Sequence, residues 1–248
     1  MRVRLDAACV ERGLFESRER ALRAIMAGGV LLNGRPAAKA GQPVRDGDEI
    51  TLAVPDCPYV SRGGLKLKGA LKRFGINLAG QVCADIGAST GGFTDCMLQE
   101  GASAVYAVDV GAGQLHEKLR SDARVVFMPG LNARFLEPGL FPVKPGFCAI
   151  DVSFISLKLV LGPVLKILSD GGSAVALVKP QFELAPAALR KGIVKTEELR
   201  LQALEGLRNG LGTLFPEAEE RGCMDSTIKG ARGNLEFLWY LGKKETEC

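Results

Sequence analysis

The stretch VCADIGASTGGFTDCM (residues 82–97) constrains the fold most, because an apolar run ends in an acid, then glycines, then a helix-compatible segment. A strand, turn and helix in this order form the ligand crevice of doubly wound α/β domains. Dinucleotide loops need G-x-G-x-x-G and phosphate loops need G-x-x-x-x-G-K-[ST]. Here the glycines are Gly87, Gly91 and Gly92, and no Lys follows. Because Asp85 at the strand end would repel a phosphate, the pattern predicts a ligand that is not held through phosphates.

After residue 59 the chain alternates strand-like and helix-like segments. Runs such as AVYAVDV (104–110) are nearly continuous in apolar residues, which is typical of parallel strands covered on both faces. We therefore predict an α/β fold with a doubly wound, Rossmann-like sheet in residues 62–248. The predicted strands are 81–86, 104–109, 124–128, 147–152, 173–179 and 235–241, and the predicted helices are 91–100, 113–120, 156–168 and 196–211.

Residues 1–54 have the pattern of a separate small α+β unit. RLDAACVERG (4–13) and SRERALRAIMAGG (17–29) predict two short helices that end at glycines, the second with Ser17 as its N-cap. Two strand-like runs follow beside the tight-turn pairs Asn-Gly and Asp-Gly. Because two prolines interrupt PDCP (55–58), we predict a linker at 55–61. The predicted runs are 30–32 and 49–54, and the turn pairs are 33–34 and 46–47.

Basic residues gather in two parts of a chain whose formal net charge is only +4. They are spread over the two short helices of the first unit, and five of them stand between Ser61 and Phe74 without an acid. Clustered cations predict a polyanionic partner, although a solvated helix face accounts equally well for the charges at 61–74. The candidate RNA contacts are Arg4, Arg18, Arg20, Lys39, Arg62 and Lys68.

Apolar runs and cysteines indicate the class of protein. No run approaches the length of a membrane span, and the first residues lack the apolar segment of a signal peptide. The seven cysteines form no C-x-x-C pair, which favours buried thiols in a reducing compartment over disulfides or zinc. We expect a cytoplasmic protein without a metal site or a membrane association.

Acids at two strand ends suggest the ligand. Asp109 follows Asp85 by 24 residues, at the place where a doubly wound nucleotide site accepts hydrogen bonds from ribose hydroxyls. Backbone N–H groups at the following helix start can hold a carboxylate. S-adenosylmethionine combines ribose hydroxyls, a carboxylate and an ammonium without a phosphate, and Asp85 would face its positively charged end. Capping of a strand-to-helix turn is the alternative role for either acid.

The fourth strand-like run, AIDVSFISL, indicates the reaction class. An N-P-P-Y-like tetrad for base amines is missing, and so is a Cys after Pro for cytosine carbon. The chain instead offers Asp151 at this strand end and Lys179 at the next, with Lys66 and Glu236 elsewhere. Two lysines among acids can orient a hydroxyl, lower its pKa and receive its proton. Unconnected surface charges remain an alternative for Lys66 and Glu236.

Several motifs in one order resemble the TlyA family: YVSRGGLKLKGAL, DIGASTGGFTD, YAVDVG, NAR, DVSFISL, LVKPQFE and IKGARGNLEF. The first fifty residues resemble the S-four-type RNA-binding module, through RLD, SRERA, LLNG and VRDGDEI. The resemblance implies an FtsJ-like S-adenosylmethionine-dependent methyltransferase that methylates the 2'-hydroxyl of cytidine in ribosomal RNA, with ribosomal subunits as partners. The implied catalytic tetrad is Lys66, Asp151, Lys179 and Glu236, with Lys179 activating the hydroxyl. The cofactor candidates, from residues and resemblance together, are Asp85, Gly87, Ser89, Gly91, Gly92, Phe93, Asp109 and Asn132.

Two other functions compete with this interpretation. The family also carries the label hemolysin, which suggests a membrane-active protein, but no span and no long, strongly amphipathic stretch supports a pore. A non-catalytic RNA-binding protein would require a broken tetrad or glycine loop, and both are intact. His116, the single histidine, is expected at the surface.

Overall fold

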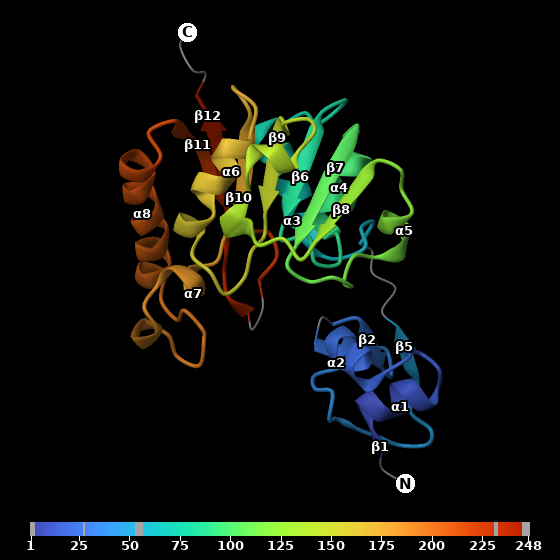
Figure 1. Cartoon of the computed structure of the whole chain (residues 1–248). Coiled ribbons are helices and arrows are strands. Elements are labelled where there is room, and N and C mark those ends of the chain that lie inside the picture. The colour runs from blue at the N-terminus through green and yellow to red at the C-terminus, as the bar shows by residue number, and fades with distance from the viewer. Residues whose placement is uncertain (1–2, 27, 53–56, 231–232, 245–248) are drawn as a thin grey trace. The chain divides into compact units, whose positions relative to one another are not determined.

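The computed structural model describes residues 3–26, 28–52, 57–230 and 233–244. The chain divides into two compact units, Met1–Pro58 and Tyr59–Cys248 (Figure 1). The domain boundaries expected from sequence, 1–54 and 62–248 with a linker at 55–61, stay a prediction. Residues 55–56 of that linker, and 53–54 of the strand-like run before it, lie outside the described residues.

The first unit packs two helices against short strands. Helix α1 (Leu5–Glu11) is followed by Arg12 as its C-cap and by Gly13, which has a φ of +70°. Helix α2 (Arg18–Met26) begins as predicted, because the N–H of Arg20 donates to Ser17 Oγ at 3.3 Å. Asn33 and Gly34 both have positive φ, so they form the tight turn between the first two strands of a small sheet. The strands are β1 (Val3–Arg4), β2 (Val30–Leu32), β3 (Arg35–Pro36), β4 (Pro43–Val44) and β5 (Ile50–Leu52).

The second unit is built on a seven-stranded sheet of order β11-β12-β10-β9-β6-β7-β8. All neighbouring strands from β10 to β8 are parallel, whereas β11 and β12 are antiparallel to their neighbours. The predicted α/β doubly wound fold is confirmed, and the strand order reverses between β6 and β9. The strands are β6 (Val82–Ile86), β7 (Ala104–Asp109), β8 (Val125–Pro129), β9 (Phe147–Ile150), β10 (Ser173–Val178), β11 (Ala218–Asp225) and β12 (Phe237–Lys243).

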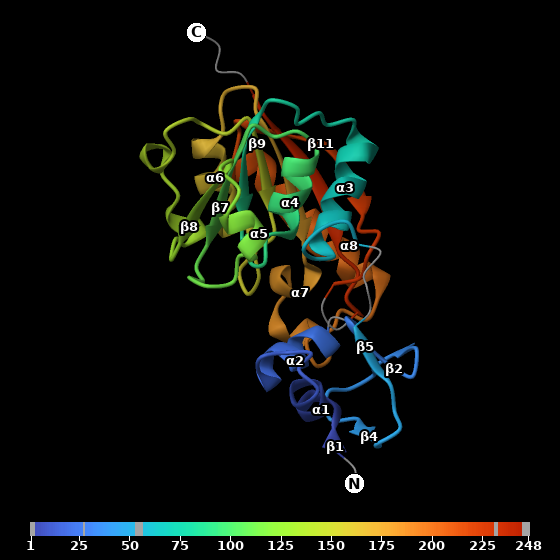
Figure 2. The same ribbon diagram turned by 90° about the vertical axis from the view of Figure 1, so that its right-hand side faces the viewer.

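Helices cover both faces of this sheet, because its strands alternate apolar side chains between two sides. Ala84 and Ile86 of β6 face a core shared with α6 (Leu161–Ile167) and α8 (Glu197–Leu214). On the opposite face lie α3 (Gly63–Phe74) and α4 (Gly92–Gln99), and Figures 1 and 2 show α6 on one side and α3 and α4 on the other. Trp239 and Phe147 are among the largest fully buried side chains.

Several elements differ from the sequence expectation, among them α3, which was not one of the predicted helices. The helix expected at 113–120 is only α5 (Glu117–Arg120), and His116 before it is exposed, as expected, and caps it. The segment 156–168 is divided into a 3-10 turn, η3 (Leu157–Leu159), and α6. Strand β11 was not expected, because its sequence AEERGCMD has no apolar alternation. It is an edge strand whose charges pair locally, as Glu220 does with Arg208 at 2.7 Å. The remaining short elements are the 3-10 turns η1 (Ala133–Phe135), η2 (Pro138–Leu140) and η4 (Pro186–Ala188) and the short helix α7 (Pro180–Glu183).

Candidate active site

A cleft of about 1050 Å³ opens beyond the carboxyl ends of β6, β7 and β9. This is the point where the strand order reverses, and there a doubly wound sheet binds its ligand. Gly87, Ser89, Asp109 and Asn132 line one part of it, and Asp151 lines another. Because the strands are parallel, residues far apart in sequence meet at this edge.

Asp109 closes β7 and organises the loops around it. Its Oδ2 accepts the N–H of Ser89 at 2.8 Å, and its Oδ1 accepts the N–H of Gly111 at 2.7 Å. Each carboxylate oxygen keeps further acceptor capacity. The carboxylate is therefore fixed by the backbone of two loops and can still receive hydrogen bonds from a ligand in the cleft.

The glycines of the turn are required by the protein's own packing. A Cβ on Gly87, whose φ is +91°, would lie 2.5 Å from the carbonyl oxygen of Asp151. On Gly91, at φ +94°, it would lie 2.2 Å from Leu119 Cδ1, and on Gly92 it would meet Ser61. The sequence expectation was close approach to a ligand. The structure gives another sufficient reason, the close approach of the backbone after β9, of α3 and of α5 to this turn. Of these glycines only Gly87 is among the described residues lining the cleft.

Asp85 is fully buried and faces the first turn of α4. Its Oδ2 accepts the N–H of Thr94 at 2.8 Å and the Thr94 hydroxyl at 2.6 Å. It thus caps a helix whose own N-cap, Gly91, offers no side chain. Its Oδ1 has no partner among the described residues. Burial raises the pKa of Asp85 to about 7, with Asp151 and Asp109 adding to the rise and Thr94 opposing it. Contact with the ammonium of a cofactor stays a prediction.

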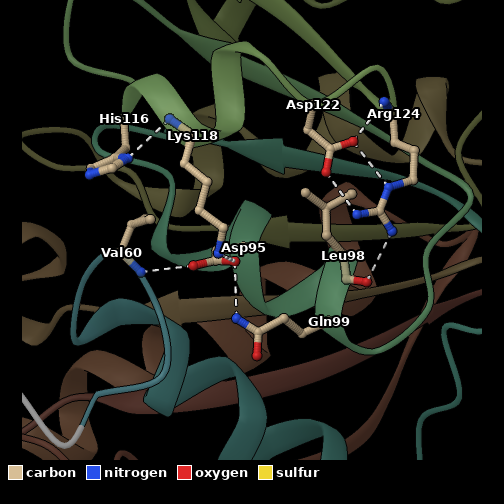
Figure 3. Close-up of polar contacts among 8 residues, drawn as sticks. All are labelled: Val60, Asp95, Leu98, Gln99, His116, Lys118, Asp122 and Arg124. Carbon is tan, nitrogen blue, oxygen red and sulfur yellow. Dashed lines mark hydrogen bonds and ion pairs between the residues drawn. The ribbon is translucent and has the colours of Figure 1, made fainter.

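A second polar cluster surrounds Asp95 of α4 (Figure 3). Asp95 is 2% exposed, and its carboxylate accepts the N–H of Val60 at 2.8 Å and the Gln99 amide at 3.0 Å. Lys118 of α5 reaches the same carboxylate at 3.3 Å. One buried acid on α4 therefore fixes the start of the second unit and α5 against the helix that follows the glycine turn.

Lys179 follows β10 directly and contacts two residues that line the cleft, although it is not itself among the described lining residues. Its Nζ lies 2.6 Å from Asp151 Oδ1 and donates to Ser153 Oγ at 2.7 Å. The Lys179 side chain is 12% exposed, and Asp151 is partly exposed to the cleft. Ser153 was not singled out from the sequence, although it stands two residues after Asp151 in DVSFISL.

Lys66 and Glu236 form a buried ion pair. Lys66 Nζ of α3 lies 2.6 Å from Glu236 Oε2, with side chains 11% and 2% exposed. They are therefore not unconnected surface charges, the alternative that the sequence left open. Val178 pairs with Phe237, so Lys179 after β10 and Glu236 before β12 lie at the same end of neighbouring strands. The structure brings all four predicted catalytic side chains to this end of the sheet as two ion pairs.

Two cofactor candidates named by resemblance occupy different places. Asn132 lines the cleft, where its Oδ1 accepts the N–H of Arg134 at 3.0 Å. Phe93 is 3% exposed and packs beside the first residue of α3, Gly63. Its part in cofactor binding stays a prediction.

The cleft suits S-adenosylmethionine better than a phosphate ligand. Its described lining holds two carboxylates, Asp109 and Asp151, and one cation, Arg134. Carboxylates accept hydrogen bonds from hydroxyl and ammonium groups and repel phosphates. The orphaned Oδ1 of Asp85 lies just behind the same strand end. Within the described residues, no group of three or more His, Cys, Asp or Glu side chains is arranged to hold a metal ion.

The residues predicted to contact RNA differ in whether their charges are paired with acids of the protein. Arg4 and Arg18 both contact the buried carboxylate of Asp6, at 2.9 and 3.2 Å, and chiefly the Arg4 hydrogen bond lowers the pKa of Asp6 to about 2. Arg20 pairs with Glu16, and Lys68 pairs with Glu100 at 2.6 Å. Lys39 and Arg62 are exposed. The charges of α3 thus do not form one basic surface, because Lys66 is buried and Lys68 is paired.

Comparison with known proteins gives consistent matches over both units. The model described as FtsJ-like methyltransferase matches residues 59–243, and the S4 domain matches residues 3–50. The Mycobacterium tuberculosis protein named 16S/23S rRNA (cytidine-2'-O)-methyltransferase TlyA is 41% identical over 241 residues, covering 96% of this chain and 89% of that protein.

Two further relatives carry a different name. Hemolysin A of Brachyspira hyodysenteriae is 40% identical over 239 residues, covering 95% of this chain and 98% of that protein. A solved structure from Streptococcus thermophilus, also described as a hemolysin, is 46% identical with a TM-score of 0.78, covering 99% of this chain and 90% of that one. No helix in the described part of this chain is long and apolar enough to cross a membrane.

Proposed function

Because this chain belongs to the TlyA family of FtsJ-like methyltransferases and carries an S4 domain, we propose that it methylates a ribose 2'-hydroxyl of ribosomal RNA. The acceptor nucleotide is a cytidine, in the RNA of the small subunit, the large subunit or both. The observation that carries the proposal is the Lys179–Asp151 ion pair at the cleft edge, backed by the buried Lys66–Glu236 pair. Those pairs suit activation of a hydroxyl and include neither a metal site nor a nucleophilic thiol.

Lys179 performs the proton chemistry in this proposal. S-adenosylmethionine, when bound, supplies a methyl group on a positively charged sulfur, which accepts the bonding electron pair as the methyl leaves. Lys179 orients the 2'-hydroxyl and takes up its proton at Nζ, while Asp151 holds the lysine and balances its charge. Glu236 and Lys66 support this end of the sheet from the buried side.

Asp109 and the glycine turn hold the cofactor. The Asp109 carboxylate accepts hydrogen bonds from the ribose hydroxyls, and Ser89 and Asn132 lie in the same part of the cleft. Gly87, Gly91, Gly92 and Phe93 set the course of the backbone there. The first unit binds ribosomal RNA through exposed basic side chains, with Arg62 contributing from the second unit.

Mass-spectrometric mapping of ribose methylation tests this function. Purified small and large ribosomal subunits, from cells that lack the protein, are incubated with the enzyme and S-adenosylmethionine. We expect a new 2'-O-methylcytidine with the wild-type protein and none with Lys179→Ala. Lys179→Arg should also be inactive, since a guanidinium does not release its proton near neutral pH. Exposed Lys144 supplies the matched control, and Lys144→Ala should retain activity.

The same preparations separate the competing functions. Dye leakage from liposomes by wild-type protein, with no methylation of either subunit, would favour a membrane-active protein. Tight subunit binding without methylation would favour a non-catalytic RNA-binding protein. A fully active Lys179→Arg variant would exclude Lys179 as the proton acceptor and leave it an electrostatic role at most.

A further inference from the structure

Ser153 is the one neutral partner of Lys179 in the described structure. An ammonium has three N–H donors. Lys179 Nζ donates to Ser153 Oγ at 2.7 Å and forms an ion pair with Asp151 Oδ1 at 2.6 Å. Ser153 is exposed and lines the cleft, as Asp151 does. Two fixed contacts determine where the remaining position on the lysine nitrogen points.

The loop that carries Ser153 is anchored on both sides. Before it, the N–H of Asp151 donates to the carbonyl of Ile86 at 2.9 Å. After it, the Ser156 hydroxyl and the Leu157 N–H donate to the partly buried carboxylate of Glu183 at 2.6 and 2.9 Å. Glu183 belongs to α7, the helix that starts immediately after Lys179. The same short stretch of chain therefore fixes both the lysine and the far end of the loop.

Backbone strain marks the residue next to Ser153. Phe154 has a φ of +64°, a conformation that bulky side chains rarely adopt. Such a conformation persists only where surrounding contacts hold it, and it clusters at functional sites. The Ser153–Lys179 and Ser156–Glu183 hydrogen bonds lie on either side of it and supply those contacts.

We propose that Ser153 is a positioning residue for Lys179, acting with Asp151 to direct the free position of the lysine nitrogen into the cleft. This inference rests on the proposed methyl transfer for its consequence, whereas the Ser153–Lys179 contact can be measured without it. Removal of the hydroxyl leaves the lysine nitrogen with Asp151 alone, so the side chain can rotate away from the acceptor oxygen.

The sharpest test compares Ser153→Thr with Ser153→Val, two side chains of the same shape that differ by a hydroxyl. We expect the Val variant to lose between about 10- and 100-fold in kcat through misplacement of the lysine. The KM for ribosomal subunits and the calorimetric affinity for S-adenosylmethionine should change less than about twofold. The Thr variant should retain most of the activity, because it keeps the hydroxyl.

A cofactor-free measurement and a matched control complete the experiment. Acetic anhydride labels amines, so mass spectrometry of the Lys179 peptide should show faster labelling in Ser153→Val than in Ser153→Thr, because the lysine nitrogen then lacks its hydroxyl partner. Ser103 is an exposed serine outside the described cleft lining, and Ser103→Ala should change neither the labelling nor the kinetics. Equal labelling and equal kinetics of the Thr and Val variants would overturn the role of Ser153 while leaving the methyltransferase in place. Labelling that differs as expected in a protein that methylates neither subunit would retain the contact and overturn the proposed function.

Discussion

At the scale of single residues, the two strand-end acids Asp85 and Asp109 have opposite surroundings. Asp109 is partly exposed in the cleft and is held by two backbone N–H groups, whereas Asp85 is buried with one oxygen unpartnered. A carboxylate that keeps solvent access can stay charged and bind a ligand. A buried one is driven toward its neutral form. The two acids therefore need different tests.

Replacement of Asp109 tests the cofactor site. Asp109→Asn keeps the shape and one acceptor oxygen, so the loops at Ser89 and Gly111 are disturbed less than in an alanine variant. We expect affinity for S-adenosylmethionine to fall by about 1–3 kcal/mol, the usual cost of losing a charged hydrogen-bond partner. Isothermal calorimetry measures it, with Asp122→Asn, an acid paired with Arg124 instead, as control. Unchanged affinity of the Asp109 variant would place the cofactor elsewhere.

Replacement of Asp85 tests its buried charge. The pKa of Asp85 is raised to about 7 by burial, against about 3.9 in an unfolded chain. Between these two pKa values the folded state binds more protons than the unfolded chain. The stability that protonated Asp85 contributes is therefore complete below about pH 4 and is lost as pH rises through 7. Asp85→Asn carries no charge and should remove this loss, which is on the order of 2–4 kcal/mol.

Urea unfolding of wild type and Asp85→Asn at pH 5 and pH 8 gives the measurement. The variant should gain relative stability at pH 8. Asp122→Asn should lose a similar amount of stability at both pH values, because hydrogen bonds from Arg124 lower the pKa of Asp122 and the group is charged in the folded and unfolded states throughout this range. A wild-type stability that rises from pH 5 to pH 8 as much as that of Asp85→Asn would contradict the buried charge.

At the scale of elements, the turn between β6 and α4 requires glycines because neighbouring elements pack closely against it. Gly87 touches the backbone after β9, and Gly91 touches the side chains of Leu115 and Leu119 around α5. The turn therefore lies directly against the backbone of Asp151 at the edge of the cleft.

Gly87→Ala tests that coupling. The added methyl would face a carbonyl oxygen 2.5 Å away at a φ of +91°, so both the contact and the backbone conformation oppose it. We expect a loss of about 2 kcal/mol or more in the free energy of unfolding. Gly113→Ala is the matched control, since an added Cβ there meets nothing within 4 Å and its φ is ordinary. Similar urea midpoints for both variants would show that the turn accommodates a side chain.

At the scale of the whole molecule, the division into two units predicts a division of labour. The second unit contains the cleft and both ion pairs, so a protein lacking residues 1–58 should fold and bind S-adenosylmethionine. It should bind ribosomal subunits more weakly and with a shallower salt dependence, because fewer phosphates are neutralised. Filter binding between 50 and 200 mM salt, roughly the range over which such contacts are lost, measures both quantities. Equal affinity of the truncated and full-length proteins would leave the first unit without a role in binding RNA.

Charge-reversal variants identify which basic residues contribute to RNA binding. The ion pairs in the structure determine which residues are suitable for this test. Reversing Arg4 or Arg18 would place an acid beside Asp6 and reduce stability together with RNA binding. Arg23 and Arg35 are exposed and form no ion pair with any described residue, so Arg23→Glu with Arg35→Glu tests RNA binding with less effect on the fold. Thermal unfolding of the double variant controls for stability.

Local pattern in the sequence was sufficient for the fold class, most strands and the glycine turn, because strand and helix periodicity and strand-end acids are properties of neighbouring residues. The same is true of Ser17 as a cap and of Asp109, Asp151 and Lys179 at the cleft edge. The polar edge strand β11 left no such signal, because its charges are neutralised by partners on α8 and on itself.

Only the tertiary structure decided which side chains meet. Lys66 and Glu236 are separated by 170 positions, and their pairing depends on α3 packing beside the start of β12. Packing likewise placed Asp85 where it accepts hydrogen bonds from Thr94, brought Arg4 and Arg18 into contact with Asp6, and made Ser153 a partner of Lys179. Burial and charge pairing are set by elements distant along the chain. A sequence pattern therefore names the ionisable residues of such a site, and the packed fold determines which of them are paired, buried or free to act.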